Sequence, residues 1–357
     1  MEHYMDGDVL QEDIEWIIKN NTVLDKLKNM TVMVTGATGL IGAQIVKTLA
    51  YYNKACGAGI HIIIMARNQK KAKEVFGDIL EFGDIELYIA DINHLPELNR
   101  TVDYIIHAAS ATSSQYFVSN PVETIWTAIN GTKNILDFAK EQNIKGLVYL
   151  SSLEVYGTPV KQVELIEEDD YGYIDQLNVR SSYSEGKRLA ECLCVSYAKE
   201  YGVPVNIARL SQTFGPGVAY DDGRVFAEFA RCAIEQRDII LHTEGKTVRS
   251  YCYTKDAVNA ILYILLKGTV AEAYNVTNMD TAISIRDMAE LVCETVGSSK
   301  IKVVIDAGKD IAQFGYNPEM IIKLSSRKLN KLGWKATVGL EEMYRRMVHS
   351  MTQEKKE

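Results

Sequence analysis

From residue 31 to about residue 210, short apolar runs rich in β-branched residues alternate with longer stretches of helical periodicity. The apolar runs are TVMVT, IHIIIMA, IELYIA, VDYIIHAA, GLVYLSS and VPVNIARL. Continuous apolar strands separated by helical segments form parallel sheets, because each crossover returns the chain along a covering helix. The sequence therefore predicts an α/β fold with a doubly wound parallel sheet and a smaller, mixed C-terminal lobe.

Three regions are expected along the chain. Residues 1–29 hold one amphipathic helical pattern and are predicted to be a helical extension that packs on the fold. Residues 30–210 open with a strand that runs into a glycine-rich turn and a helix, TVMVTGATGLIG, and would form a Rossmann-type dinucleotide-binding domain. Segments of 239–275 would return to it. Residues 211–357 would form mainly a substrate-binding lobe. Because no Pro-, Ser- or Gly-rich linker separates the last two regions, we expect them to share a cleft.

Composition excludes several classes of protein. The chain has 357 residues, of which 47% are hydrophobic, and this is enough for a full core. A net charge of −8 argues against nucleic acid as a partner. The six cysteines lack CxxC spacing, so we expect no bound metal and a reducing compartment. No signal-like start or membrane-length apolar run occurs, which favours a cytoplasmic protein away from membranes.

The first strand leads directly into a glycine-rich turn with GxxGxxG spacing, and a helical pattern follows it. Glycine is needed where the turn is tight, where the backbone approaches a diphosphate, and where helix and strand touch. The N-terminus of the helix then faces the phosphates. The turn is predicted to bind NAD or NADP through Gly36, Thr38, Gly39, Leu40, Ile41 and Gly42.

The end of the second strand bears on the choice between the two cofactors. An acidic residue there usually holds the ribose hydroxyls of NAD, but this chain has Ala66 and Arg67. Arg67 can bind a 2′-phosphate, which favours NADP, or it can be a solvated side chain. Asp91 is expected at the adenine edge, or as a turn cap. Cofactor contacts are also predicted for Ile92, Ala108 and Ala109.

Tyr183 and Lys187 lie one helical turn apart in YSEGK, so both side chains leave the same face of a helix. An ammonium group beside a phenol is expected to lower the phenol pKa from about 10 toward neutrality. The tyrosinate would then remove a hydroxyl proton while hydride leaves the same carbon. Lys187 would also bind the nicotinamide ribose. A bare YxxxK is common by chance, but here it follows the glycine turn and a strand that ends in Ser151 and Ser152.

The motifs GATGLIG, HAAS, SSLEVYG, YSEGK, RLSQTFGPG, RSYCYTKDAV and KLGWKATVGLEE occur in this order. Through these ordered motifs the chain resembles the extended short-chain dehydrogenase/reductase family, also called NAD-dependent epimerases/dehydratases. The resemblance extends from residue 31 to about residue 347. Within it the chain is most similar to the UDP-glucuronate decarboxylase branch, through segments such as SNPVETIWTAINGTKNIL and RSSYSEGKRLAE. The resemblance implies a nucleotide-sugar substrate that passes through a 4-keto intermediate.

The resemblance also implies roles for individual residues. Ser152 would hydrogen-bond the reacting hydroxyl, and Glu154 would be an acid/base near C5 of the sugar or, alternatively, a turn-capping residue. Arg224 and Arg249 would hold the diphosphate of the substrate. Further substrate contacts are expected from Ser110, Tyr116 and Gln212. Many family members dimerise through the YxxxK helix, so a homodimer is expected, with Leu189 and Leu193 as candidate interface residues.

Some positions depart from the decarboxylase pattern and keep other reactions open. Gln212 stands where asparagine is usual, and Gly217 where arginine is usual. Arg67 favours a reductase of a keto-sugar or keto-polyol, because such an enzyme draws on NADPH while a decarboxylase regenerates its own NAD. A nucleotide-sugar epimerase is a further alternative, whereas Leu153 disfavours 4,6-dehydratases, which carry an Asp-Glu pair there. A cofactor-binding protein without turnover is disfavoured because Ser152, Tyr183 and Lys187 are all present.

Overall fold

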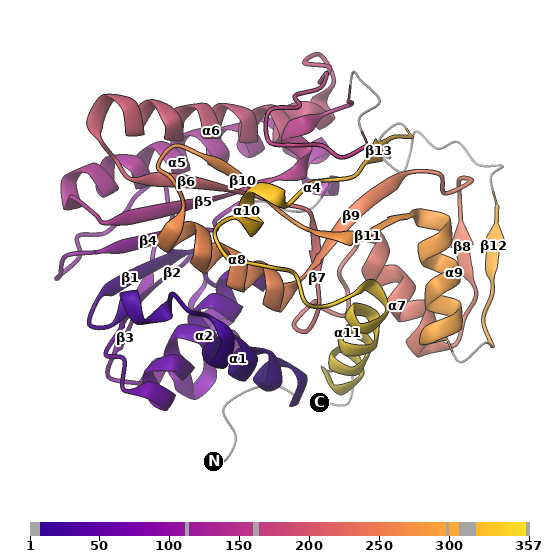
Figure 1. Ribbon diagram of the computed structural model, residues 1–357, viewed down its shortest axis with the longest axis horizontal. Helices are drawn as coiled ribbons and strands as arrows, with labels where there is room; N and C mark the ends of the chain where they lie inside the picture. The colour runs from indigo at the N-terminus through magenta and orange to yellow at the C-terminus, as the bar shows by residue number, and fades with distance from the viewer. Residues whose placement is uncertain (1–7, 111–113, 160–163, 298–299, 307–318, 355–357) are drawn as a thin grey trace.

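The computed structural model describes residues 8–110, 114–159, 164–297, 300–306 and 319–354. Its centre is a seven-stranded sheet of parallel strands in the order β10-β6-β5-β4-β1-β2-β3 (Figure 1). The strands are β1 (Thr31–Thr35), β2 (His61–Ala66), β3 (Ile85–Ile89), β4 (Tyr104–His107), β5 (Gly146–Ser152), β6 (Val205–Leu210) and β10 (Ala273–Val276). The predicted doubly wound α/β fold is therefore confirmed, and each of the six apolar runs forms one strand.

Both faces of this sheet are covered by helices, which explains the continuous apolar runs. Val32 and Val34 of β1 point to one face and pack with α2 (Leu40–Cys56) and α8 (Thr254–Lys267). Met33, between them, points to the other face and packs with α5 (Pro121–Gln142) and α6 (Ser182–Tyr201). Figure 1 shows α5 and α6 on one side of the sheet and α2 and α8 on the other. The glycine turn and the YSEGK segment are thereby fixed to one rigid sheet.

Short helices connect these elements and carry several site residues. They are α3 (Gln69–Phe76), α4 (Ser114–Ser119) and the 3₁₀ helices η2 (Gly77–Glu81), η3 (Leu153–Tyr156) and η4 (Val179–Ser181). Among the described residues, no helix has the length and apolar content needed to cross a bilayer.

The predicted helical extension is present as α1 (Asp8–Asn20), followed by the 3₁₀ helix η1 (Leu24–Leu27); residues 1–7 lie outside the described part. Ile17, Leu24 and Leu27 are buried in the same core as α2 and α8. Asn21 donates to Asn259 Oδ1 over 2.7 Å, which ties the extension to α8. The extension is therefore part of the folded core of this chain.

The C-terminal half adds two smaller sheets and their helices beside the large one (Figure 1). The first contains β7 (Gln212–Phe214), β9 (Val248–Tyr253), β11 (Asn278–Ser284) and β13 (Ile321–Ile322), and the second contains β8 (Ile239–Leu241) and β12 (Val303–Ile305). Their helices are α7 (Val225–Glu235), α9 (Ile285–Thr295), α10 (Arg327–Asn330) and α11 (Leu340–Glu354). Of the segment 239–275, α8 and β10 lie on the large sheet, whereas β8 and β9 belong to the smaller sheets. The domain boundaries expected after residues 29 and 210 stay a prediction.

Candidate active site

The predicted glycine turn joins β1 to α2. Gly36 has a φ of +62°, and a Cβ built there would lie 2.6 Å from the backbone of Ala108 and Ala109. A Cβ on Gly42 would lie 2.5 Å from the carbonyl oxygen of Gly36. Side chains are therefore excluded from both positions, and α2 begins directly after the turn, with Gly39 as its N-cap. The open amides at this helix start fit the diphosphate of a dinucleotide.

The strand ends beside the turn carry the other predicted cofactor residues. Arg67 directly follows β2 and its side chain is exposed. Asp91 follows β3, and its Oδ1 accepts from the backbone and side-chain nitrogens of Asn93 at 2.8 Å and 2.7 Å. Asp91 thus caps the next turn, and its predicted place at the adenine edge stays a prediction. Ile92 is buried and packs against Gly131 of α5.

Ala108 and Ala109 lie against Gly36, at the end of β4. The preceding residue, His107, is buried, and its Nδ1 lies 2.7 Å from Thr35 Oγ1. Burial lowers the pKa of His107 to about 3, so its imidazole is neutral and structural. Two predicted substrate residues follow this strand: Ser110 is partly buried and Tyr116, on α4, is exposed.

Tyr183 lies at the N-terminal end of α6, next to the end of β5. Ser152, the last residue of β5, lies close enough to the phenol to lower its pKa. The Tyr183 ring stacks on Phe117 of α4, with centroids 4.2 Å apart and planes at 11°. The structure thus brings Ser152 and Tyr183 together, as the sequence predicts, and α4 fixes the orientation of the phenol.

Lys187 is buried on the same face of α6. Its Nζ donates to the carbonyl oxygen of Leu150 over 2.7 Å and lies 5.8 Å from the centre of the Tyr183 ring. Burial lowers the pKa of Lys187 to about 8. The ammonium is therefore positioned by β5 and remains close to the phenol.

The predicted lowering of the Tyr183 pKa is wrong for the protein alone. Burial and the nearby Glu154 carboxylate raise the pKa of Tyr183 to about 12, although Ser152 and the charges of Arg180 and Arg224 act to lower it. The spacing YxxxK reveals a shared helix face, but it does not reveal how strongly the phenol is buried. Burial opposes the charged tyrosinate, and here it outweighs the nearby cations.

Glu154 lies in η3, immediately after Ser152. Its Oε1 accepts from Arg180 Nη2 over 3.1 Å, and its Oε2 accepts from Ser184 Oγ over 3.1 Å. The cap of η3 comes instead from the Ser152 side chain, which accepts from the Glu154 amide. The Glu154 side chain is therefore not the turn cap of the alternative interpretation, and it faces the segment that carries Tyr183.

Two more arginines of the C-terminal half lie near Tyr183 and Glu154, one at the start of α7 and one on β9. Arg224 is the N-cap of α7, and its Nε lies 3.0 Å from Asp222 Oδ1. Arg249, on β9, is 9% exposed and donates to the backbone oxygens of Val248 and Met320. Burial lowers the pKa of Arg249, while the Glu154 carboxylate raises it. Gln212 lies on β7, which pairs with β9. The site therefore lies between the large sheet and the smaller four-stranded sheet.

Arg180 was not among the residues predicted from the sequence, although it stands only three positions before Tyr183. Its guanidinium carbon lies 5.1 Å from the centre of the Phe117 ring, on which Tyr183 stacks. Phe117 was missed as well. The nearest sequence signal was the arginine at the start of RSSYSEGK, but its contacts depend on how α4 and η3 pack, which a sequence pattern does not reveal.

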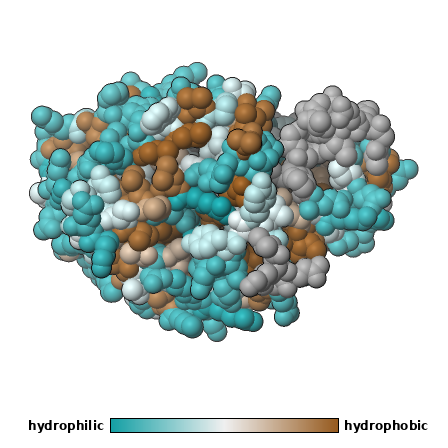
Figure 2. Space-filling model, turned by 90° about the horizontal axis from the view of Figure 1, so that it is seen from above, coloured by the Kyte–Doolittle hydropathy of each residue, from teal (hydrophilic) through white to brown (hydrophobic). Residues whose placement is uncertain are grey.

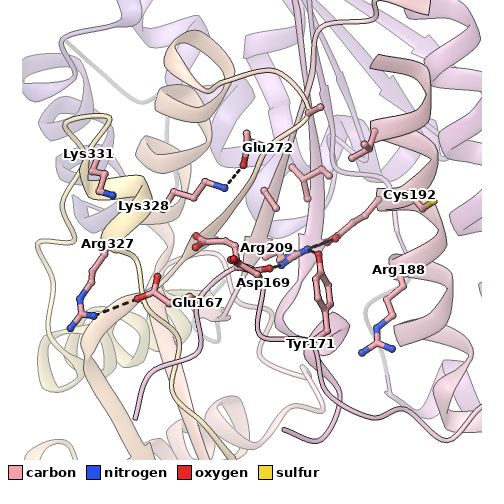
Figure 3. Close-up of a pocket in the computed structure, with 16 residues that line it drawn as sticks. Glu167, Asp169, Tyr171, Arg188, Cys192, Arg209, Glu272, Arg327, Lys328 and Lys331 are labelled. Carbon is pink, nitrogen blue, oxygen red and sulfur yellow. Dashed lines mark hydrogen bonds and ion pairs between the residues drawn. The ribbon is translucent and has the colours of Figure 1, made fainter. Parts of the chain in front are cut away.

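A cavity of about 900 Å³ lies elsewhere, beside the β10 edge of the large sheet (Figure 3). Its lining charges are partly paired, since Arg327 contacts Glu167 and Lys328 contacts Glu272. Buried Arg209 is held by Glu191, with Nε to Oε1 at 3.0 Å. None of the four predicted catalytic residues lines this cavity.

The family can be assigned from the sequence together with this geometry. The model of the NAD dependent epimerase/dehydratase family matches residues 32–277, which include the glycine turn, Ser152 and YSEGK. The chain belongs to this family. The class of enzyme predicted from the sequence, a short-chain dehydrogenase of the epimerase/dehydratase type, is thereby confirmed.

Curated relatives narrow the likeness further. UDP-glucuronic acid decarboxylase 3 of Arabidopsis thaliana is 31% identical over 316 residues, which cover 88% of this chain and 86% of the relative. UDP-glucuronic acid decarboxylase 1 of Xenopus tropicalis is 30% identical over 324 residues, covering 90% of this chain and 72% of the relative. The predicted resemblance to the decarboxylase branch is confirmed at this level of identity.

Solved structures share the fold over nearly the whole chain. The epimerase Mth375 of Methanothermobacter thermautotrophicus aligns with a TM-score of 0.77 at 21% identity, covering 98% of this chain and 97% of that one. A UDP-glucuronic acid 4-epimerase of Bacillus cereus, in complex with NAD and a fluorinated UDP-glucuronic acid, aligns with a TM-score of 0.75 at 20% identity, covering 91% and 99%. At these identities the likeness concerns the fold.

Proposed function

We propose that this protein is an NAD(P)-dependent enzyme that transforms a nucleotide-diphosphate sugar, most similar in reaction to UDP-glucuronate decarboxylase. The observation that carries the proposal is the position of Tyr183 beside Ser152 at the end of β5, with Lys187 fixed there by its bond to the Leu150 carbonyl oxygen. The decarboxylases related to this chain support the substrate class. Glu154 supports the reaction, because it lies close enough to influence both Tyr183 and Arg249.

The reaction follows from ordinary carbonyl chemistry. Tyr183 takes the proton of the C4 hydroxyl while the C4 hydrogen leaves as hydride. The new C4 ketone is β to the carboxylate on C5, so the bond between C5 and the carboxylate carbon breaks. Carbon dioxide leaves, and the electron pair of that bond enters the enolate. Glu154 acts as the acid/base that supplies the proton to C5. Tyr183 would return its proton to the C4 oxygen as hydride comes back to C4, which would regenerate the oxidised cofactor.

The high pKa of Tyr183 bears on the first step. When bound, an oxidised nicotinamide would supply the hydride acceptor and a positive charge. Burial and Glu154 raise the pKa of the phenol to about 12. A further positive charge is therefore needed to stabilise the tyrosinate. Lys187, with a pKa of about 8, is buried next to this position. We therefore infer that cofactor binding completes the general base.

Product masses test the proposal most simply. Purified protein is incubated with a panel of nucleotide sugars, with and without NADPH. Loss of the mass of carbon dioxide from UDP-glucuronate is expected. An unchanged mass with altered retention would identify an epimerase instead. In parallel, Glu154→Gln is expected to retain oxidation at C4 and to lose any step at C5.

A second candidate, an NADPH-dependent reductase of a nucleotide-linked keto-sugar or keto-polyol, is favoured by one observation. Arg67 is exposed at the end of β2, directly after Ala66, and is free to meet a 2′-phosphate. A product that gains two hydrogens only with NADPH would support this candidate. Arg67→Asp is expected to shift the preference from NADP toward NAD, whereas equal preference before and after would leave Arg67 a solvated residue.

We also propose that the protein forms a cytoplasmic homodimer through α5 and α6. Exposed apolar side chains gather on these two helices: Val122, Ile125, Trp126, Leu189 and Val195. Seen from above, apolar surface interrupts the polar surface of the molecule (Figure 2). All six cysteines are free thiols, as suits a reducing compartment. Sedimentation as a clean monomer would contradict the dimer, and Trp126→Glu is expected to produce that monomer.

A further inference from the structure

Lys187 carries its charge in a buried place that offers few partners. Its Nζ donates to the carbonyl oxygen of Leu150, and burial lowers its pKa to about 8. Among the described residues, one carboxylate acts to raise this pKa, that of Glu191. Arg209 already binds the Glu191 carboxylate through two nitrogens, at 3.0 Å and 2.7 Å. The charge of Lys187 is therefore only weakly compensated by charged groups.

The ring of Tyr149 is a further partner of this ammonium. Tyr149 lies on β5, next to Leu150, and is buried in the core that α6 covers. Lys187 Nζ lies over the Tyr149 ring, 4.6 Å from its centre, and 5.8 Å from the centre of the Tyr183 ring. The face of an aromatic ring attracts an ammonium, more strongly where water is excluded. The Tyr149 ring therefore stabilises the charged form of Lys187.

The neighbouring strand holds this ring in place. His107 of β4 pairs with Tyr149 in the sheet, and their ring centres lie 5.6 Å apart, with planes at 42°. His107 is itself anchored to β1, since its Nδ1 lies 2.7 Å from Thr35 Oγ1. Burial lowers the pKa of His107 to about 3 and raises the pKa of Tyr149, so both rings are neutral. Lys187 thus faces a fixed, uncharged aromatic ring.

We propose that Tyr149 is a positioning residue for Lys187: the face of its ring keeps the ammonium charged and directed toward the Tyr183 phenol and the cofactor. The inference rests on the proposed function, because it concerns the cation of the proposed general base. Tyr149 acts only through Lys187. Without the ring, the buried ammonium would keep its bond to Leu150 but would lose its proton at a lower pH.

Tyr149 also fills the core between β5 and α6, and such a structural role must be separated from the proposed one. Fluorine atoms on a phenylalanine ring draw electron density from its face and change its shape little. Tyr149→Phe and its counterparts with one, two and three ring fluorines therefore form a matched series. The hydroxyl can be omitted from this series, because it lies near Thr132 and no described group meets it in hydrogen-bond geometry.

Equilibrium binding of reduced cofactor reports the charge of Lys187 without turnover. NADH and NADPH are titrated through their own fluorescence at increasing pH. The cofactor diphosphate favours the ammonium, so affinity is expected to fall as Lys187 loses its proton, around pH 8 in the parent protein. Tyr149→Phe is expected to keep this midpoint within about 0.3 pH unit. Three fluorines are expected to lower it by about one pH unit, with one and two fluorines in between.

Two further variants complete the test. Tyr149→Leu removes the aromatic face altogether and is expected to lower the midpoint at least as far as three fluorines do. Lys187→Met is expected to abolish the fall near pH 8. In the Lys187→Met background, each change of the Tyr149 ring is expected to alter cofactor affinity by less than about twofold. Near-ultraviolet circular dichroism and urea unfolding check that each variant is folded.

A midpoint that stays constant along the fluorine series would overturn the role of Tyr149. So would equal effects of the ring changes with and without the Lys187 side chain, because they would then act through packing alone. The proposed function is judged separately, by the products that the parent protein forms from nucleotide sugars. A shifting midpoint in a protein that transforms none of them would leave the role of Tyr149 standing and reject the proposed reaction.

Discussion

Tyr183 experiences opposing influences on its phenol. Burial and Glu154 raise its pKa, whereas Ser152, Arg180 and Arg224 lower it, and the result is about 12. The ultraviolet absorbance of tyrosinate, taken as the difference between wild type and Tyr183→Phe, is expected to titrate well above pH 10 without cofactor. Oxidised cofactor is expected to lower this midpoint. A midpoint at or below 10 in the protein alone would contradict this account.

The same variant tests the role of Tyr183 in turnover. Tyr183→Phe removes only the proton-accepting oxygen, and the ring can still stack on Phe117. The turnover rate is expected to fall by at least about 100-fold, the usual lower contribution of a general base. Cofactor affinity, measured by fluorescence, is expected to change little. An active Phe variant would remove Tyr183 from the reaction.

Lys187 makes a prediction about pH and stability. Its pKa falls from 10.5 to about 8 on folding, so the charged form is the one that burial penalises. Below pH 8 Lys187 is charged in the folded protein, and the free-energy cost of burying this charge is fully present. The cost disappears as pH rises to 10.5, where the unfolded chain also loses the proton. The unfolding free energy of wild type relative to Lys187→Met is therefore expected to increase over this range, by about 3 kcal/mol. A difference that stays flat in urea titrations would contradict the shift.

The positions of the candidate catalytic residues could be predicted from the sequence, but the contacts around them could not. Ser152, Tyr183 and Lys187 lie within a strand end and one helix turn, where local spacing determines position. Arg180 is positioned by Glu154 and Phe117, which belong to two other segments. The pKa of Tyr183 was predicted with the wrong sign, because burial depends on packing that spacing does not contain.

Among the elements, the turn between β1 and α2 has the strictest requirements. A methyl group on Gly42 would meet the Gly36 carbonyl oxygen at 2.5 Å and Ala37 Cα at 2.9 Å. Gly42→Ala is therefore expected to displace the turn and to weaken cofactor binding by at least about tenfold. Gly83→Ala is the matched control, because nothing lies within 4 Å of the added methyl. Equal cofactor affinity of the two variants would remove the turn from the cofactor site.

The strands of the large sheet were predictable because each is buried on both faces and reads as an unbroken apolar run. The strands of the smaller sheets were not. β7, with three residues, and β13, with two, are too short for a periodic signal. β9 is long, but its residues were interpreted only as part of the motif RSYCYTKDAV. Its partners β11 and β13 come from other parts of the chain, so the sequence pattern did not reveal the pairing.

At the scale of the whole molecule, α1 and α11 are joined by a charged cluster. Arg346 of α11 contacts Asp13 of α1 at 3.0 Å, and its Nε donates to Tyr253 Oη over 2.8 Å. Tyr253 Oη also donates to Asp13, over 2.6 Å. Burial raises the pKa of Asp13 to about 6 in spite of these partners. Two ends of the chain are thereby held to β9, which carries Arg249.

Arg346→Met is expected to leave the Asp13 carboxylate buried without its cation. The unfolding free energy should fall by about 3 kcal/mol, and more at pH 8 than at pH 5, because Asp13 is ionised at the higher pH. Limited proteolysis should then cut near α1. Arg345→Met is the control. Among the described residues Arg345 pairs only with exposed Glu341, so a change under about 0.5 kcal/mol is expected. Equal stability of both variants would contradict the importance of the cluster.

The central claim is hydride transfer at a sugar carbinol next to Tyr183. Its most direct measurement uses UDP-glucuronate with deuterium at C4, oxidised cofactor and the wild-type enzyme. The account predicts deuterium on the nicotinamide during a single turnover, and deuterium again at C4 in a product that has lost carbon dioxide. Unlabelled nicotinamide, with the substrate consumed, would contradict it.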